Sequence, residues 1–161
     1  MKLAGLILAG GRSQRMGQDK ALLEIGGVPL LRQTWEVADS LTSDVWVVTP
    51  YRDRYAALLP TKTQWVDELL PADAAPPGPL VALGQALPVI EADWVLLLAC
   101  DLPNLRVEAL RQWVQVLPGL SPDAIAYVPK TARGWEPLCG FYRRSCLSSL
   151  QAYSITGKRR Q

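Results

Sequence analysis

Residues 3–20 read LAGLILAGGRSQRMGQDK, and the expected fold follows from this stretch. Its first part, Leu3–Ala9, is a short apolar run that ends in glycine, which is typical of a buried β-strand. Its second part, Gly10–Asp19, is polar and rich in glycine, which predicts a loop directly after the strand. Successive glycines expose backbone N–H groups, and Arg15 and Lys20 add cationic donors, so the stretch could hold a polyphosphate. The glycine spacing matches neither a dinucleotide-binding fingerprint nor a P-loop. An ordinary glycine-rich turn with solvated charges is the alternative.

Carboxylates follow two further predicted strands. Trp94–Ala99 is apolar at every position, as is common for parallel strands covered on both faces, and Asp101 comes soon after it. A carboxylate there faces the edge at which α/β sheets bind ligands, and it suits Mg²⁺, which keeps waters and takes substrate phosphates. Asp67 is a second carboxylate at the end of a predicted strand. Both could instead be caps, of a helix or turn for Asp101 and of a loop for Asp67.

Strands and helices are expected to alternate along the chain. Strands are expected at Leu3–Ala9, Asp44–Thr49, Thr63–Val66, Trp94–Ala99, Ala124–Val128 and Glu136–Tyr142, with a short extended piece at Leu22–Ile25. Helices are expected at Leu30–Leu41 with Pro29 in the first turn, Asp53–Leu59, Leu80–Leu87, Val107–Val116 and Arg144–Ala152, and loops at Asp67–Pro79 and Pro129–Trp135. This order predicts an α/β, doubly wound, mostly parallel sheet. Its ligand edge would gather residues 10–20, 49–52, 67–79 and 100–103.

Composition excludes several classes of function. The chain has 161 residues, which indicates one domain. It has no histidine, which excludes a Ser–His–Asp triad and a histidine general base. Its 17 basic and 15 acidic residues are too balanced for a nucleic-acid binder. Three cysteines without a CxxC pair disfavour a disulfide framework and fit a cytoplasmic location. The apolar runs are too short for a membrane helix, and arginine follows the first one too closely for a signal peptide.

The motifs together resemble one known family. LAGGRSQRMGQDKALLEIGGVPLL, residues 8–31, is similar to the signature loop of molybdenum cofactor guanylyltransferases, the MobA family. PPGPL at 76–80 and CDLP at 100–103 occur in the family's order and at about its distances, so the resemblance covers nearly the whole chain. It implies a Rossmann-like, three-layer α/β/α nucleotidyltransferase fold with a mostly parallel sheet.

The resemblance also implies an activity. Members of this family transfer GMP from GTP to the terminal phosphate of molybdopterin in the molybdenum cofactor, with Mg²⁺ as cofactor and pyrophosphate as leaving group. The acceptor phosphate attacks the α-phosphorus directly, so the reaction suits a chain without histidine. A molybdopterin-delivering insertase or a molybdoenzyme chaperone is the implied protein partner.

Site residues are implied position by position. Asp101 matches the Mg²⁺ ligand, Lys20 matches a lysine on the GTP phosphates, and Arg15 would join them in stabilising the pyrophosphate. The residues that match nucleotide-binding positions are Leu8, Ala9, Gly10, Gly11, Lys20, Asp67, Gly78, Leu80 and Asp101.

The chain departs from the family pattern in two places. Family members often have asparagine at the end of the second strand, where this chain reads Val48-Thr49-Pro50, so a nucleotide contact there must come from backbone or from Thr49. Family members also continue past the last predicted helix, so the C-terminal part of the fold is expected to be missing. Lys158–Arg160 match a region that meets the molybdopterin phosphate, with a solvated tail as the alternative.

Other functions stay open at this point. A related transferase could use CTP or a sugar phosphate, and a nucleotide-binding homologue could lack catalysis. Cytosine-selective relatives tend to have alanine at the position of Gly10, which favours guanine here. Five of the six tryptophans are core candidates, whereas Trp135, in a predicted loop, is placed near the pterin side.

Overall fold

The computed structural model describes residues 1–10, 17–70, 78–102 and 104–156. The strands are β1 (Leu3–Leu8), β2 (Glu24–Ile25), β3 (Val28–Pro29), β4 (Val45–Thr49), β5 (Gln64–Asp67), β6 (Trp94–Ala99), β7 (Ala126–Tyr127), β8 (Lys130–Thr131), β9 (Gly134–Trp135) and β10 (Cys139–Arg143). The helices are α1 (Leu30–Asp39), α2 (Arg52–Tyr55), α3 (Pro79–Ala86), α4 (Val107–Val116) and α5 (Cys146–Thr156), with 3₁₀ turns η2 (Lys20–Leu22), η3 (Ala56–Leu58) and η4 (Leu117–Gly119).

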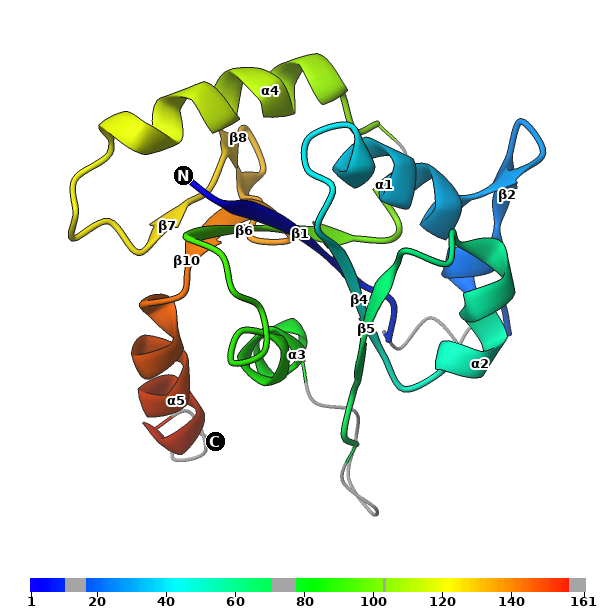
Figure 1. The fold of residues 1–161 in the computed structure, drawn as a ribbon. Coiled ribbons are helices and arrows are strands. Elements are labelled where there is room, and N and C mark those ends of the chain that lie inside the picture. The colour runs from blue at the N-terminus through cyan, green and yellow to red at the C-terminus, as the bar shows by residue number, and fades with distance from the viewer. Residues whose placement is uncertain (11–16, 71–77, 103, 157–161) are drawn as a thin grey trace.

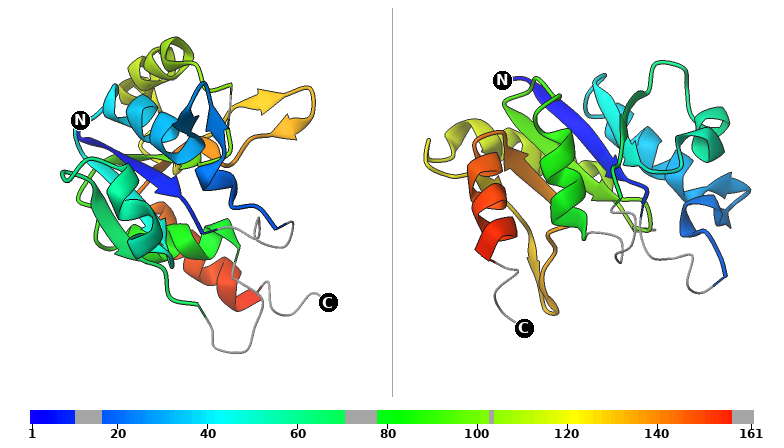
Figure 2. Two further views of the ribbon diagram at one scale, coloured as in Figure 1. Left: turned by 90° about the vertical axis from the view of Figure 1, so that its right-hand side faces the viewer. Right: turned by 90° about the horizontal axis from the view of Figure 1, so that it is seen from below.

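Six of the described strands form one sheet in the order β5-β4-β1-β6-β10-β7 (Figure 1). The first four run parallel, and β10 runs antiparallel to both β6 and β7. Helices cover both faces of this sheet, α1 and α4 on one and α3 and α5 on the other (Figures 1 and 2). The expectation of a three-layer α/β fold with a mostly parallel sheet is therefore confirmed.

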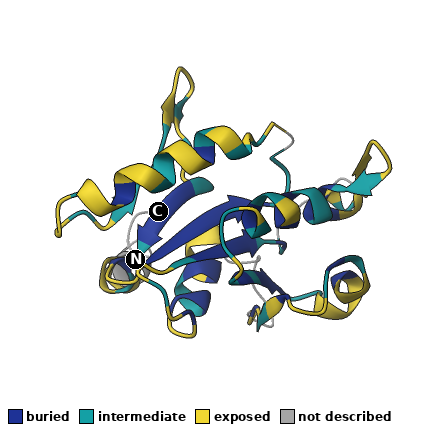
Figure 3. Ribbon diagram, turned by 45° about the horizontal axis from the view of Figure 1, so that its top comes forward, coloured by how far each residue is buried: buried dark blue, intermediate teal, exposed yellow. Residues whose placement is uncertain are grey.

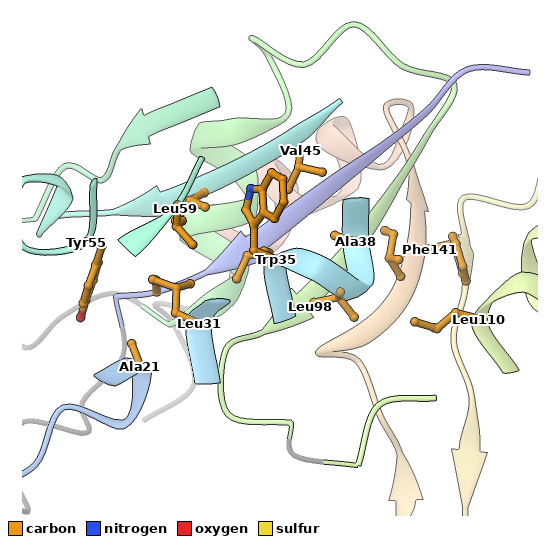
Figure 4. Packing of buried hydrophobic residues seen from close by; sticks show 14 of the residues in the cluster. Ala21, Leu31, Trp35, Ala38, Val45, Tyr55, Leu59, Leu98, Leu110 and Phe141 are labelled. Atoms are coloured by element: carbon orange, nitrogen blue, oxygen red, sulfur yellow. The ribbon is translucent and has the colours of Figure 1, made fainter. Parts of the chain in front are cut away.

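The sheet divides the core into two layers, because successive side chains of a strand point to opposite faces. On β1, Ile7 packs into the layer that contains Trp35 of α1, whereas Leu6 packs into the layer that contains Leu83 of α3. Figure 4 shows the first layer, in which α1 side chains meet Leu98 and Phe141. The central strands are buried while the outer faces of the helices are exposed (Figure 3). Residues of β6 are buried at every position, which explains the uniformly apolar sequence of that strand.

The predicted elements agree with the structure best where the pattern is long and periodic. Trp94–Ala99 and Val107–Val116 have the predicted bounds. Pro29 lies before the first turn of α1 rather than in it, since it pairs with Glu24 in the small β2–β3 hairpin. Asp67 is the last residue of β5 rather than the start of a loop.

The predictions are wrong between β7 and β10. The expected loop Pro129–Trp135 is a hairpin, in which Gly134 has a φ of 123° that other residues rarely adopt. The expected strand Glu136–Tyr142 begins only at Cys139, because a turn closed by the Cys139 N–H on the Glu136 carbonyl (3.1 Å) precedes it. Proline after the first residue of such a turn is favourable, and Pro137 has that position.

Truncation of a β6 side chain should destabilise the whole sheet. Leu96 is fully buried, so Leu96→Ala is expected to lower the free energy of unfolding by about 2–5 kcal/mol, measured by urea denaturation. Val89, which is 52% exposed, provides the control, and Val89→Ala should change stability by less than about 0.5 kcal/mol. Equal effects of the two substitutions would contradict the described core.

Candidate functional site

The chain reverses its direction of winding between β1 and β6. From β1 it continues outward to β4 and β5, then crosses through α3 to β6 on the other side of β1. Ligands of open α/β sheets bind beyond the carboxyl ends of the strands at such a switch point. Leu8 pairs with Ala99 at the ends of these two strands, and the Cys100 N–H donates to the Leu8 carbonyl at 3.3 Å. Gly10 and Asp101 therefore leave the sheet side by side.

Three hydrogen bonds fix the backbone where the glycine loop begins. The Ala9 N–H donates to the Val48 carbonyl (3.0 Å), the Thr49 hydroxyl donates to the Ala9 carbonyl (2.8 Å), and the Glu68 N–H donates to the Thr49 carbonyl (3.0 Å). Thr49 is fully buried, and its hydroxyl also accepts from the Tyr51 N–H at 3.0 Å. The Thr49 hydroxyl therefore bonds only groups of the protein's own main chain. Of the two expected sources of a nucleotide contact here, this leaves the main chain and not the Thr49 side chain.

Lys20 and Asp101 meet at this edge although 81 residues separate them in the sequence. The Lys20 ammonium lies 3.3 Å from Asp101 Oδ2, and both side chains are about half exposed, 46% and 40%. An ion pair in water contributes at most about 1 kcal/mol, so a ligand can separate these two charges at little cost. Both residues belong to the expected site, and the structure brings them together.

Asp19 fixes the position of Lys20. Its Oδ1 accepts from the Ala21 N–H at 3.1 Å and so caps the 3₁₀ turn η2, which begins at Lys20. Its Oδ2 accepts from the Tyr55 hydroxyl at 2.6 Å and from Arg54 at 3.1 Å. Burial, followed by these interactions with Asp19, raises the pKa of Tyr55, so its hydroxyl stays protonated as a donor. The sequence analysis assigns no role to Asp19, although an aspartate directly before a short helical turn is typical of a helix cap.

Glu68 lies against Gly10, and the sequence analysis missed it. A Cβ atom on Gly10 would overlap Glu68 Oε2 and lie 3.0 Å from Pro50 Cδ, so the carboxylate occupies the space that a side chain would need. Glu68 is only 8% exposed, and this burial raises the pKa of its carboxyl. Asp67, the residue expected here, instead points outward with a side chain 70% exposed, 3.9 Å from Arg52. Adjacent acids at a strand end point to opposite faces, so the sequence indicates that only one of the two faces the site but does not say which.

Gly78 and Leu80 lie where α3 begins. Gly78 precedes the helix, Pro79 is its first residue, and Leu80 is 39% exposed. The Gln85 side chain bonds both backbone groups of Leu69, at 2.9 and 3.1 Å, which ties the segment after β5 to this helix. Leu8 and Ala9 end β1 as expected. The expected residues Gly11, Arg15 and Lys158–Arg160 lie outside the described residues.

The side chains at this edge fit a metal ion that takes most of its ligands from the bound substrate and from water. Within residues 1–10, 17–70, 78–102 and 104–156, no group of three or more Asp, Glu, Cys or His side chains could enclose a metal ion. Asp101 alone offers a half-exposed carboxylate, and Mg²⁺ commonly binds one or two carboxylates together with water and phosphate oxygens. A hollow of about 740 Å³ that includes Lys2, Asp93 and Arg143 lies at the opposite end of the strands and has no part in this arrangement.

A doubly wound sheet with a lysine and an aspartate at its switch point, beside Gly10, is typical of the nucleotide-binding class of α/β proteins. Residues 5–161 match the model of the MobA-like NTP transferase domain. A "Probable molybdenum cofactor guanylyltransferase" of Synechococcus elongatus is 48% identical over 159 residues, which are 99% of this chain and 81% of that protein. The molybdenum cofactor guanylyltransferase of Pseudomonas paraeruginosa is 37% identical over 83% of this chain and 64% of its own length. The chain therefore belongs to the MobA-like NTP transferase family and is an enzyme of the nucleotidyltransferase class.

Solved structures agree on the fold. Rv0371c of Mycobacterium tuberculosis superimposes with a TM-score of 0.74 at 20% identity, over all of this chain and 84% of that one. Molybdopterin-guanine dinucleotide biosynthesis protein A of Archaeoglobus fulgidus gives a TM-score of 0.67 at 18% identity, over 96% of this chain and 74% of that one. In the part of the chain that the structure describes, no helix has the length and apolar character needed to cross a membrane.

Addition of one methyl group at Gly10 should show the contact with Glu68. Gly10→Ala is expected to lower the free energy of unfolding by about 1–3 kcal/mol, because the Glu68 carboxylate must leave its place. Glu68→Ala makes room for the methyl group. The loss in free energy of unfolding of the double variant should therefore be smaller, by at least about 0.5 kcal/mol, than the summed losses of the two single variants. Gly84→Ala in α3, where a Cβ meets nothing within 4 Å, is the control and should not destabilise. Strict additivity would contradict the contact.

Stability should depend on pH through the buried Glu68 carboxyl. Its pKa is higher in the folded than in the unfolded protein, so the folded protein is most stable when this group is protonated and loses stability as pH rises past the unfolded pKa. Glu68→Gln removes this titration. The Tm of the variant relative to the parent should therefore increase between pH 4 and pH 8, measured by thermal denaturation. A difference in Tm that stays constant over this range would contradict the burial of the charge.

Proposed function

We propose that the protein transfers GMP from GTP to the terminal phosphate of molybdopterin in the molybdenum cofactor and releases pyrophosphate. The observation that carries this proposal is the Lys20–Asp101 pair at the switch point, beside the start of the glycine loop. The names of the relatives at 48% and 37% identity support the choice of substrates. Transfer between two phosphates needs no protein nucleophile, and positioning and charge stabilisation account for most of the catalysis in phosphoryl transfer.

Lys20 and Asp101 would exchange partners when substrate binds. Asp101 would hold Mg²⁺, which would supply positive charge to offset that of the phosphates. A Mycobacterium tuberculosis protein of the same fold is described as a complex with manganese. Lys20, released from Asp101, would donate to the GTP phosphates and stabilise the pyrophosphate as it leaves. Asp19 would keep the lysine backbone in place during this exchange, because it is bonded on two sides.

Glu68 supports guanine as the base. A guanine presents a ring N–H and an amino group side by side, and a carboxylate accepts from both. Cytosine has no ring N–H on the corresponding edge, so it would leave one carboxylate oxygen unpaired in a buried place, which is costly. Glycine at position 10 is needed for this contact, since alanine there would displace the Glu68 carboxylate. GTP is therefore expected to stabilise the protein more than CTP or UTP in a thermal-shift assay.

Substitution of the two charged residues tests the proposal. Asp101→Asn should abolish Mg²⁺-dependent release of pyrophosphate from GTP in the presence of molybdopterin, and Lys20→Ala should weaken GTP binding in a titration. Asp123→Asn, an exposed acid far from this edge, is the control and should retain activity. Activity of Asp101→Asn within about threefold of the parent would show that this carboxylate does not hold the metal. GTP binding without transfer by the parent would favour a binding protein that lacks catalysis.

A further inference from the structure

The β8–β9 hairpin projects from the same end of the sheet as Asp101. It leads directly into β10, whose first residue pairs with Leu98, and the Ala99 N–H donates to the Leu138 carbonyl at 2.9 Å. Because β10 runs antiparallel to β6, residues before β10 and residues after β6 leave at the same end of the sheet. Figure 2 shows the hairpin, drawn in orange, projecting from the body of the protein.

The hairpin is small but well braced. The Thr131 hydroxyl lies 3.3 Å from the Gly134 carbonyl and 3.2 Å from the Glu136 carboxylate, and it accepts from the Arg133 N–H at 3.1 Å. At the neck, the Glu136 N–H donates to the Pro129 carbonyl at 3.0 Å. These bonds hold the hairpin and the Glu136 carboxylate in a defined place at the site end.

Trp135 is 64% exposed on this hairpin. Trp35 and Trp94, in contrast, are 3% and 2% exposed and belong to the core. The ammonium of Lys130 lies 5.4 Å from the Trp135 ring centroid, which adds positive charge beside the indole. The indole of Trp135 is exposed to solvent on a hairpin fixed by hydrogen bonds, so it lacks the stabilising burial of most tryptophan side chains. It is therefore available to stack on another ring.

The order of the strands separates this hairpin from the nucleotide side. Glu68 and Gly10 lie at the ends of β5 and β1, and the hairpin lies beyond β10 on the other side of β6. Asp101, at the end of β6, is between them. A donor nucleotide on the β5 side and an acceptor on the β10 side would therefore meet at Asp101.

We infer that Trp135 binds the pterin ring of the acceptor, an inference that rests on the proposed function. The indole would stack on the flat pyrimidine part of the pterin. Glu136 lies on the other face of the hairpin, where its carboxylate bonds Thr131, so it holds the hairpin in place. Lys130 would add attraction for the acceptor's phosphate. Stacking of a base on an aromatic side chain contributes about 1–3 kcal/mol, enough to set the affinity for the acceptor. Trp135 is thus a binding residue for the acceptor and takes no part in the transfer itself.

Kinetics of Trp135→Ala and Trp135→Phe test this inference. Trp135→Ala should raise the KM for molybdopterin about tenfold and leave the KM for GTP and kcat unchanged, since stacking acts on the acceptor alone. Trp135→Phe keeps a ring and should stay within about threefold of the parent. Ile125→Ala, an exposed apolar residue at the opposite end of β10, is the control and should change neither KM. An unchanged KM for molybdopterin in Trp135→Ala would overturn the inference while the parent's activity upholds the proposed function.

Equilibrium binding of molybdopterin without GTP distinguishes failure of the Trp135 site from failure of the proposed GMP transfer. If the parent transfers no GMP but binds molybdopterin, and Trp135→Ala weakens that binding, the ring site stands and the proposed function fails. If the parent binds no molybdopterin, or if Trp135→Ala binds it as tightly as the parent, the ring site is wrong. A Trp135→Ala variant that keeps both activity and molybdopterin binding would leave the hairpin as a surface for a protein partner.

Discussion

The Thr49 hydroxyl, buried between the ends of β1 and β4, fixes the point at which the chain leaves the sheet. Its bond to the Ala9 carbonyl holds β1 to β4, while the Thr49 carbonyl holds the start of the segment after β5. Three strand ends thus share one buried residue, and a buried polar group of this kind is costly to leave unpaired. The positions of Gly10 and Glu68 depend on this arrangement, because Gly10 directly follows Ala9 and the Glu68 N–H is itself bonded to Thr49.

The two-layered core makes this edge rigid. β1 and β6 are buried on both faces, so neither strand can shift without disturbing helices on both sides of the sheet. The close approach of α1 shows the same constraint, because a Cβ on Gly5 would lie 3.1 Å from the Cβ of Ala38. Rigid strand ends allow short loops to carry the chemistry, and a phosphate site needs this precision of placement.

Most of the fold could be predicted from the sequence because its central elements have strong patterns. The all-apolar run of β6 and the helical spacing of α4 leave little choice of structure. The hairpin at Lys130–Trp135 could not be predicted, since its strands are two residues long and depend on a turn at Gly134. Sequence motifs likewise placed Lys20 and Asp101 at one edge, and the structure adds that they contact each other.

Other features of the site depend on side-chain direction, which a single sequence does not state. Asp67 and Glu68 are adjacent acids, and only the pleat of β5 decides which of them faces Gly10. Asp19 looked like one charge among several in a polar loop. Its role as an anchor depends on Tyr55, which belongs to a helix 36 residues further along the chain. Contacts between segments far apart in sequence are therefore what the structure contributes.

The Lys20–Asp101 pair has a consequence for ligand selection. Each group serves as the counterion of the other, so the edge presents little net charge to solution. A free phosphate that took Lys20 would leave Asp101 unpaired, and a free cation that took Asp101 would leave Lys20 unpaired. Water solvates both half-exposed groups, so each loss costs at most about 1 kcal/mol. Only a ligand that brings an anion and a cation together replaces both partners at once, so the pair gives metal-bound polyphosphates a small preference over either ion alone.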